Sequence, residues 1–203
     1  MAIEIVGAVS GVEAEVDLNR SLQVVEFDEA GNPVVRAPNS VYSVGFGLRL
    51  SAAIAAGATV FALTNTGTEN VYIRKIFAQT GFAGTAAATA AIWSIRRITG
   101  GTPTGGTALT PAPFDVTYPA TSVGDVRYNI AATLTMGTAT PGDPIAMLMC
   151  GRQLNVGYSE VLEFEGEDRI LLAPTEGLII YLDLVSVIGD FISGAIEWEE
   201  FTP

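Results

Sequence analysis

The chain has 203 residues, of which 49% are hydrophobic and 16% charged, so it is long and apolar enough to form one domain with a buried core. A formal charge of −12 argues against nucleic-acid binding, because phosphate contacts need a basic surface. The sequence has no histidine and one cysteine, Cys150, which excludes Ser-His-Asp and Cys-His catalysis, histidine-ligated zinc and an intrachain disulfide. Frequent glycine, proline, threonine and valine predict an all-β protein, and we expect neither enzymatic activity nor a cofactor or metal.

Residues 1–40 are predicted to form an N-terminal β arm. Apolar residues alternate along 3–9 and 12–18, which predicts one hairpin, and residues 22–27 with 34–35 predict a second hairpin around a turn at 28–33. Two short hairpins are marginal on their own. Such an arm would pack on the rest of the chain or add a strand to another protein's sheet edge, and an ordinary first sheet of a single domain is an equal alternative.

Residues 41–203 are predicted to form a β-sandwich body. Strands are expected at 59–64 and 71–79, on either side of the turn Asn65-Thr66-Gly67, and in the second half of 86–98, while a helix is an alternative at 50–56. Residues 99–126 read as one long loop, in which 16 of 28 residues are Gly, Pro or Thr. Long loops are typical of contact surfaces, although a plain surface loop at one end of a sandwich is the simpler interpretation.

The C-terminal part gives the clearest pattern. Strands at 161–164, 169–172, 177–185 and 191–201 are separated by short turns, which favours an antiparallel sandwich or barrel. In the last strand, Ile192, Gly194, Ile196 and Trp198 share one face, as in a half-buried strand. Residues 178–185 are apolar on nearly both faces, so a central position in the sheet or a subunit contact should cover them.

Charge is distributed unevenly along the chain. The net charge is −5 over residues 1–40, +3 over 41–159 and −10 over 160–203. The acidic stretches fit solvated strand faces, or an arrangement in which acidic termini meet the basic middle, for example across a subunit interface. The adjacent pairs Arg74-Lys75 and Arg96-Arg97 must point to both faces of their strands, where each side chain either binds a carboxylate or covers apolar surface.

Three groups of residues could carry chemistry, and each has a simpler interpretation. Glu197 and Glu199 share a strand face about 7 Å apart, as a glycosidase pair could, but exposed strand carboxylates are far more common. Asp125 and Asp143 lie in Gly/Pro-rich segments that could bind calcium, without the spacing of a calcium-binding loop. Cys150 lies among apolar residues, which predicts a buried thiol without activation.

The chain shows no pattern that targets it to a membrane or to secretion. Its first residues lack the basic region and apolar run of a secretory signal, and the longest uncharged apolar run, 50–63, is shorter than the ~20 residues of a spanning helix. Synthesis in the cytoplasm is therefore expected.

Several segments resemble bacteriophage virion proteins. Residues 15–24, Glu-Val-Asp-Leu-Asn-Arg-Ser-Leu-Gln-Val, are similar to a short EVDxNxxLxV segment that precedes a β domain in many such proteins. Residues 40–82, the Gly/Thr-rich stretch 100–115 and the closing Gly-Ala-Ile-Glu-Trp-Glu-Glu at 194–200 also resemble phage structural proteins.

This resemblance implies a decoration or cement protein on the outer surface of the capsid, with a jelly-roll-like sandwich. It would bind the major capsid protein, form a homotrimer, and contact neither nucleic acid nor membrane. The alternative is a neck or tail adaptor, or a fibre-type receptor- or carbohydrate-binding sandwich, although Trp93 and Trp198 fit core positions better than a sugar platform. The expected partner contacts lie in the arm and in the 99–126 loop: Ile3, Ile5, Val12, Val16, Leu18, Leu22, Val24, Thr104, Leu109 and Phe114.

Overall fold

The structure is a computed structural model that describes residues 13–16, 22–25, 40–84, 90–114, 122–152, 159–163 and 169–200. The chain divides into two compact units, Met1–Pro38 and Asn39–Pro203. In the first unit, β1 (Glu13–Val16) pairs antiparallel with β2 (Leu22–Val25), with Val16 opposite Leu22. This pairing joins two strands that the sequence pattern assigned to separate hairpins. The five residues between them include Asp17, Asn19 and Ser21, which favour turns.

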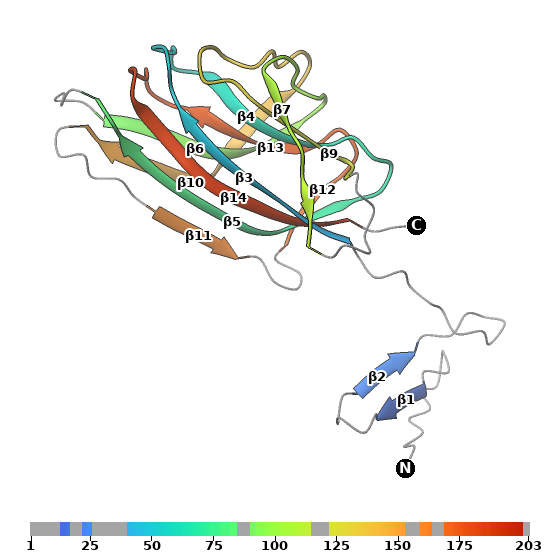
Figure 1. Cartoon of the computed structure of the whole chain (residues 1–203). Coiled ribbons are helices and arrows are strands. Elements are labelled where there is room, and N and C mark those ends of the chain that lie inside the picture. Colours follow the sequence, from blue (N-terminus) through green and yellow to red (C-terminus); the bar gives the residue numbers. More distant parts are fainter. Residues whose placement is uncertain are drawn as a thin grey trace. The chain divides into compact units, whose positions relative to one another are not determined.

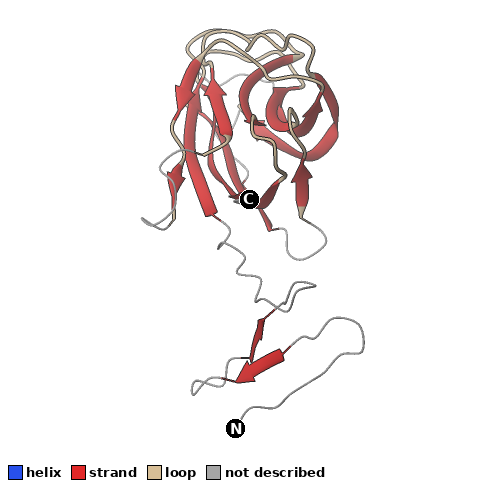
Figure 2. Ribbon diagram, turned by 90° about the vertical axis from the view of Figure 1, so that its right-hand side faces the viewer, coloured by secondary structure: helices blue, strands red, loops and turns tan. Residues whose placement is uncertain are grey.

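The second unit is an antiparallel β-sandwich, which confirms the predicted all-β class, and its described residues contain no helix (Figures 1 and 2). The first layer, the β13 sheet, has the order β10-β6-β13-β4-β9-β7. Its strands are β4 (Ala58–Asn65), β6 (Ala90–Thr99), β7 (Thr107–Leu109), β9 (Gly124–Tyr128), β10 (Thr140–Gly151) and β13 (Gly177–Leu182).

The second layer, the β14 sheet, has the order β11-β5-β14-β3-β8, and β12 also pairs with β5. Its strands are β3 (Ser40–Arg49), β5 (Val71–Phe82), β8 (Ala112–Pro113), β11 (Ser159–Glu163), β12 (Ile170–Leu172) and β14 (Asp190–Glu200).

The strand pairs of the sandwich are nested. β3 pairs with β14, β4 with β13, β5 with β11 and β12, and β6 with β10. The early strands of the body therefore pair with its late strands in reverse order, as if one long antiparallel hairpin were folded over itself. The connections from β3 to β4, β5 to β6 and β13 to β14 each cross from one sheet to the other.

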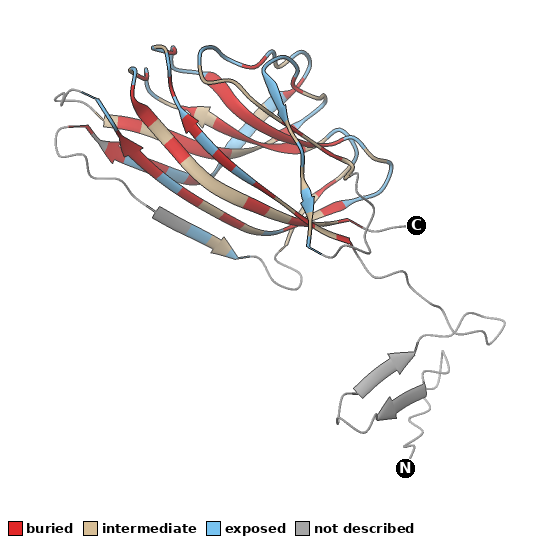
Figure 3. Ribbon diagram, viewed as in Figure 1, coloured by how far each residue is buried: buried red, intermediate tan, exposed pale blue. Residues whose placement is uncertain are grey.

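The core lies between the two sheets and follows the alternation of the strands. Along β3, buried residues alternate with more exposed ones, visible as bands in Figure 3. Trp93 and Trp198 are fully buried, and the rings of Phe46 and Phe61 pack 4.8 Å apart. The predicted inward face of β14 is confirmed, since Ile192, Ile196 and Trp198 are buried.

The predicted central position of the strand that begins at Gly177 is also confirmed. β13 lies between β6 and β4. Leu178 and Ile180 of this strand belong to the main core. Ile179, which points to the opposite face of the sheet, is buried in a second, smaller cluster with Leu134 and Ala139. The segment between β9 and β10 thus covers part of the outer face of the β13 sheet. The strand ends at Leu182 rather than at residue 185, which leaves Leu184 and Val185 in the following loop.

Two further sequence predictions are corrected. Residues 99–126 are not one loop, because β7 and β9 pair within the β13 sheet while β8 pairs with β3 in the other sheet; residues 115–121 lie outside the described part. The helix considered for 50–56 is absent, and that stretch connects β3 to β4. Alanine favours helices only weakly, and the packing of the flanking strands decides.

Candidate interaction surface

Large apolar side chains gather on one part of the sandwich surface. Among the described residues, eight large hydrophobic side chains are exposed, and six of them form two neighbouring groups. One group lies on β10 and the other in the loop between β13 and β14. We call these six residues the apolar corner: Ile145, Met147, Met149, Leu184, Val185 and Ile188.

The first group follows from the position of β10 at the edge of its sheet. Ala146, Leu148 and Cys150 alternate inward and are buried, so Met147 and Met149 point outward, 58% and 51% exposed. β10 pairs only with β6, and Met149 stands opposite Ile92. The stripe is therefore the outer face of an edge strand.

The two groups adjoin each other. The amide of Asp183, next to Leu184, donates to the carbonyl of Ile92 at 3.0 Å, and Ile92 stands opposite Met149. The guanidinium of Arg152, two residues after Cys150, donates to the Val185 carbonyl at 3.1 Å. The stripe on β10 thus continues into the loop.

The loop belongs to the end of the sandwich where β14 begins, opposite the C-terminal end in Figure 1. Backbone hydrogen bonds join it to neighbouring connections: the amide of Leu50 donates to the carbonyl of Asp190, and the amide of Ala83 donates to the carbonyl of Gly189. Gly189 has a φ of +98°, and an added Cβ there would lie 2.7 Å from the Ala83 carbonyl oxygen. The close approach of these loops requires glycine at this position.

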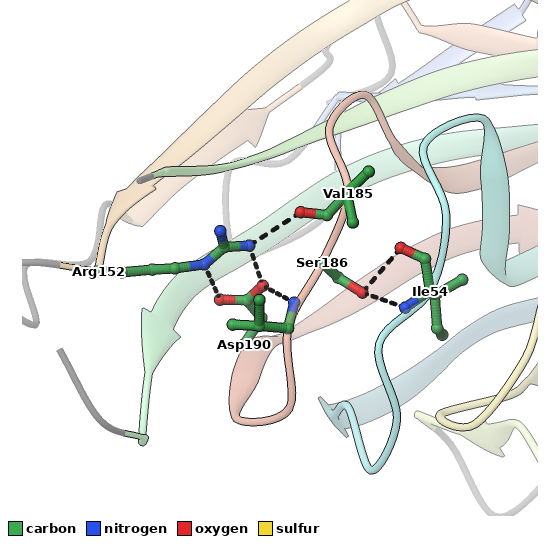
Figure 4. A network of polar contacts seen from close by, with 6 residues as sticks. Ile54, Arg152, Val185, Ser186 and Asp190 are labelled. Atoms are coloured by element: carbon green, nitrogen blue, oxygen red, sulfur yellow. Dashed lines mark hydrogen bonds and ion pairs between the residues drawn. The ribbon is translucent and has the colours of Figure 1, made fainter. Parts of the chain in front are cut away.

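A buried ion pair between Arg152 and Asp190 holds the loop between β13 and β14 on its inner side (Figure 4). The side chains of Arg152 and Asp190 are 3% and 0% exposed, and Arg152 Nε donates to Asp190 Oδ1 at 2.8 Å. Arg152 Nη2 also donates to Asp190 Oδ2, which accepts a further bond of 2.9 Å from the Val187 amide. Both carboxylate oxygens are thereby satisfied, as a buried charge requires.

Ser186 ties the same loop to the β3–β4 connection (Figure 4). Its Oγ accepts from the amide of Ile54 at 2.8 Å and donates to the Ile54 carbonyl at 3.2 Å. Polar groups inside the loop thus point inward, while Leu184, Val185 and Ile188 stay exposed. The exposed apolar side chains of the loop therefore stand on a backbone that hydrogen bonds to Asp190, Ile54 and neighbouring connections hold in place.

An ion pair lies beside the apolar corner. Arg96 Nη2 and Asp183 Oδ1 form an ion pair in which both side chains are less than one-fifth exposed, and the Arg96 guanidinium lies 4.6 Å from the centre of the Tyr181 ring. Burial raises the pKa of the Cys150 thiol, and the charge of Asp190 adds to this rise while Arg152 opposes it. Cys150 is fully buried, which confirms the predicted buried thiol.

Acidic C-terminal residues meet the basic middle within the chain. Lys75 binds Glu163, Arg96 binds Asp183, Arg97 binds Glu176, and Arg152 binds Asp190. Part of the acidic charge of the C-terminal stretch is therefore paired with the basic middle within one chain. These contacts also show that both members of the pair Arg96-Arg97 bind carboxylates.

The predicted partner-contact residues fall in different places. Val16, Leu22 and Val24 belong to the β1–β2 hairpin, while Ile3, Ile5, Val12 and Leu18 lie outside the described residues. Thr104 pairs with Thr135 in an isolated bridge. Leu109 packs against the main core, and Phe114 is 60% exposed, with its amide bonded to the Val41 carbonyl.

The carboxylates considered for catalysis or calcium take part in strand structure. Glu199 Oε2 accepts from Arg169 Nη1 at 2.6 Å, and the Asp125 carboxylate accepts from Arg127 Nε at 2.7 Å within β9. Asp143 lies in β10, beside the register shifts at Pro141 and Pro144. No group of three or more His, Cys, Asp or Glu that could hold a metal occurs among the residues described, and no helix in that part of the chain is long and apolar enough to span a membrane.

The apolar corner was not among the sequence predictions. Its signal is the run Ile-Ala-Met-Leu-Met-Cys at 145–150, which is apolar on both faces like residues 178–185. Comparisons of the chain with protein-family models, curated proteins and solved structures find no match.

Proposed function

We propose that this protein is a non-enzymatic structural component of a bacteriophage virion, a decoration protein on the outer surface of the capsid that binds the lattice of the major capsid protein and stabilises the head. The apolar corner carries this proposal. Contiguous exposed apolar surface of this kind marks protein–protein contact, and the buried Arg152–Asp190 pair fixes it in place. A surface that is ordered before binding loses less entropy when it binds.

The nested strand order supports the proposal. A fold in which early strands pair with late strands in two packed sheets is that of a jelly roll, so we propose this topology for the sandwich. Jelly rolls are common in viral capsid proteins and also in lectins. The likeness of residues 15–24 and 194–200 to phage virion proteins favours the first class.

The buried aromatic residues argue against a sugar-binding face. Both tryptophans, Trp93 and Trp198, are fully buried, whereas stacking on a sugar needs an exposed ring. The carboxylates Glu176, Asp190 and Glu199 bind arginines, which is a structural use of their charge rather than a catalytic one.

Antibody labelling of intact phage particles, viewed by electron microscopy, tests the proposal. Label spread over the heads is the expected result, and heads that lack the protein should break at lower temperature. Label confined to the neck or tail would replace the decoration role with that of an adaptor or fibre. Particles without label would overturn the proposal.

A further inference from the structure

We infer that the outer edge of β10 is an acceptor site for one strand of another protein, an extended segment that pairs with β10 along residues 145–149. The inference rests on the proposed function, in which that protein is the major capsid protein. β10 lies at the end of the β13 sheet and pairs only with β6. A strand in this position offers its unpaired backbone donors and acceptors to a further strand.

The backbone groups of Met147 and Met149 point away from β6. The carbonyl of Ile92 accepts from the amide of Asp183, which follows β13, so the backbone groups of Ile92 face β13 rather than β10. Met149 stands opposite Ile92, and in antiparallel pairs of this kind both residues turn their N–H and C=O away from each other. The same holds for Met147, two residues earlier, so its amide and carbonyl lie along the free edge.

The open part of this edge is bounded on both sides. Toward the end of β10, the hydroxyl of Thr80 on β5 donates to the carbonyl of Met149 at 3.3 Å, so the other sheet already uses that acceptor. Toward its beginning, the pairing with β6 shifts register at Pro141 and Pro144, and proline has no amide to offer. The length that remains accommodates a single short strand.

The other edge strands in the described part of the sandwich are protected against strand addition. β7 and β12 have three residues each and β8 has two, while β11 carries Glu160 and Glu163. Short edges and charged edge residues are the usual means by which proteins prevent such pairing. Residues 145–150 contain neither a charge nor a proline, and Met147 and Met149 are more than half exposed. This edge therefore lacks the protection that the others have.

Side chains and charge define the partner segment. Ile145, Met147 and Met149 project from one face of β10, so the segment needs apolar residues at every second position to pack beside them. Asp143 is exposed at the beginning of the stretch and forms no ion pair with a described residue, so it would attract a lysine or arginine of the segment. β10 contains no basic residue, so the β10 strand of a second copy cannot supply this charge.

Amide hydrogen exchange of the purified full chain, followed by NMR, tests whether the edge is open. We expect the amide of Met147 to exchange at least about a hundredfold faster than those of Leu148 and Cys150, which face β6 in the alternation of the ladder. Slow exchange of Met147 would overturn the inference. Protection that appears only as copies assemble at higher concentration would also overturn it, because the occupant would then be a second copy.

Co-sedimentation with phage heads that lack the protein tests the partner. Met147→Pro removes the outer amide and should weaken binding at least about tenfold, because an edge strand tolerates proline but proline cannot donate to an added strand. Met147→Ala is the matched control, since it also loses the methionine side chain but keeps the amide, and it should weaken binding less than about threefold. Asp143→Lys should weaken binding several-fold by repelling the basic residue of the segment.

Circular dichroism and thermal unfolding establish that each variant is folded. Met149→Pro, whose lost amide has the same direction, replaces Met147→Pro if the latter does not fold. Equal binding of Met147→Pro and Met147→Ala would overturn the strand pairing and leave the proposed function in place. An unaltered chain that does not bind heads would instead overturn the proposed function, and the inference with it.

Discussion

Glycine at residue 194 shows how closely the strands of the β14 sheet approach each other. A Cβ added at Gly194, on β14, would lie 1.9 Å from the carbonyl oxygen of Phe77 on the neighbouring strand β5. That contact is with backbone, so no side chain can move to relieve it. At Gly47, on β3 of the same sheet, an added Cβ would have no atom within 4 Å.

We therefore expect Gly194→Ala to lower the free energy of unfolding by at least ~2 kcal/mol, because the strands must separate to admit the methyl group. Gly47→Ala should be neutral or stabilising by about 0.5 kcal/mol, since it restricts the unfolded chain at no steric cost. Denaturant unfolding of both variants measures the difference. Equal stability of the two would contradict the backbone approach in the β14 sheet.

The Arg152–Asp190 pair makes a second prediction at the residue scale. Removing one partner leaves the other charge buried, so Arg152→Met and Asp190→Asn should each destabilise the protein by about 3–5 kcal/mol. The double variant should be less destabilised than the sum of the two, because no unpaired charge remains. Thermal or denaturant unfolding of the three variants gives the coupling energy, and strictly additive losses would show that the two side chains do not act as a pair.

At the scale of elements, an ion pair joins the turn between β12 and β13 to β6. Burial disfavours the charged form of Glu176, but hydrogen bonds from Arg97 and the amide of Ala173 outweigh this and hold the pKa of Glu176 below 4.5. The Glu176 carboxylate therefore binds a proton less readily in the folded protein than in the unfolded chain. The resulting stabilisation is complete above about pH 4.5 and disappears as the pH falls through the lowered pKa.

Glu176→Gln should accordingly reduce stability at pH 7 by up to about 1 kcal/mol, a modest loss because Arg97 is 40% exposed and solvent screens the pair. The variant should also lose less stability than the unaltered protein between about pH 5 and pH 3. Unfolding midpoints measured across this range check both effects. A parallel pH dependence for the two proteins would show that Glu176 does not contribute to acid unfolding.

At the scale of elements, the sequence predicts single strands and turns but not how the strands pair. Alternation identified β14 and the turn residues identified the end of β4, because those signals are local. The pairing of β3 with β14, which joins Val41 to Glu199, has no local signal. The segments 145–150 and 178–182 are both apolar on both faces of the strand. The first lies in β10, an edge strand with an exposed face, and the second lies in β13, a central strand.

What separates these two strands is their place in the fold. Ile179 on β13 is covered by Leu134, which comes from a connection about 45 residues away in the sequence. No described segment covers Met147, which is 58% exposed. The predicted site residues were chosen from the arm and a long loop. The apolar corner instead exists because β10 is the edge strand of its sheet, and the position of a strand in the sheet is set only when the whole sandwich has folded.

At the scale of the whole molecule, the division at Pro38 predicts that the sandwich folds without the preceding residues. Every strand of both six-stranded sheets lies within Asn39–Pro203, and a core with long-range pairing between its first and last strands unfolds as one cooperative unit. A chain that begins at Asn39 should therefore keep the circular dichroism spectrum of the sandwich and a single thermal transition.

The same truncation tests which part of the chain contacts the capsid. The apolar corner lies entirely in the retained part. If residues 1–38 supply the contact with the capsid lattice, the truncated protein should no longer bind heads that lack it, measured by co-sedimentation with the particles. Retained binding would assign the capsid contact to the sandwich, and loss of the cooperative transition would show that the first 38 residues are part of its core.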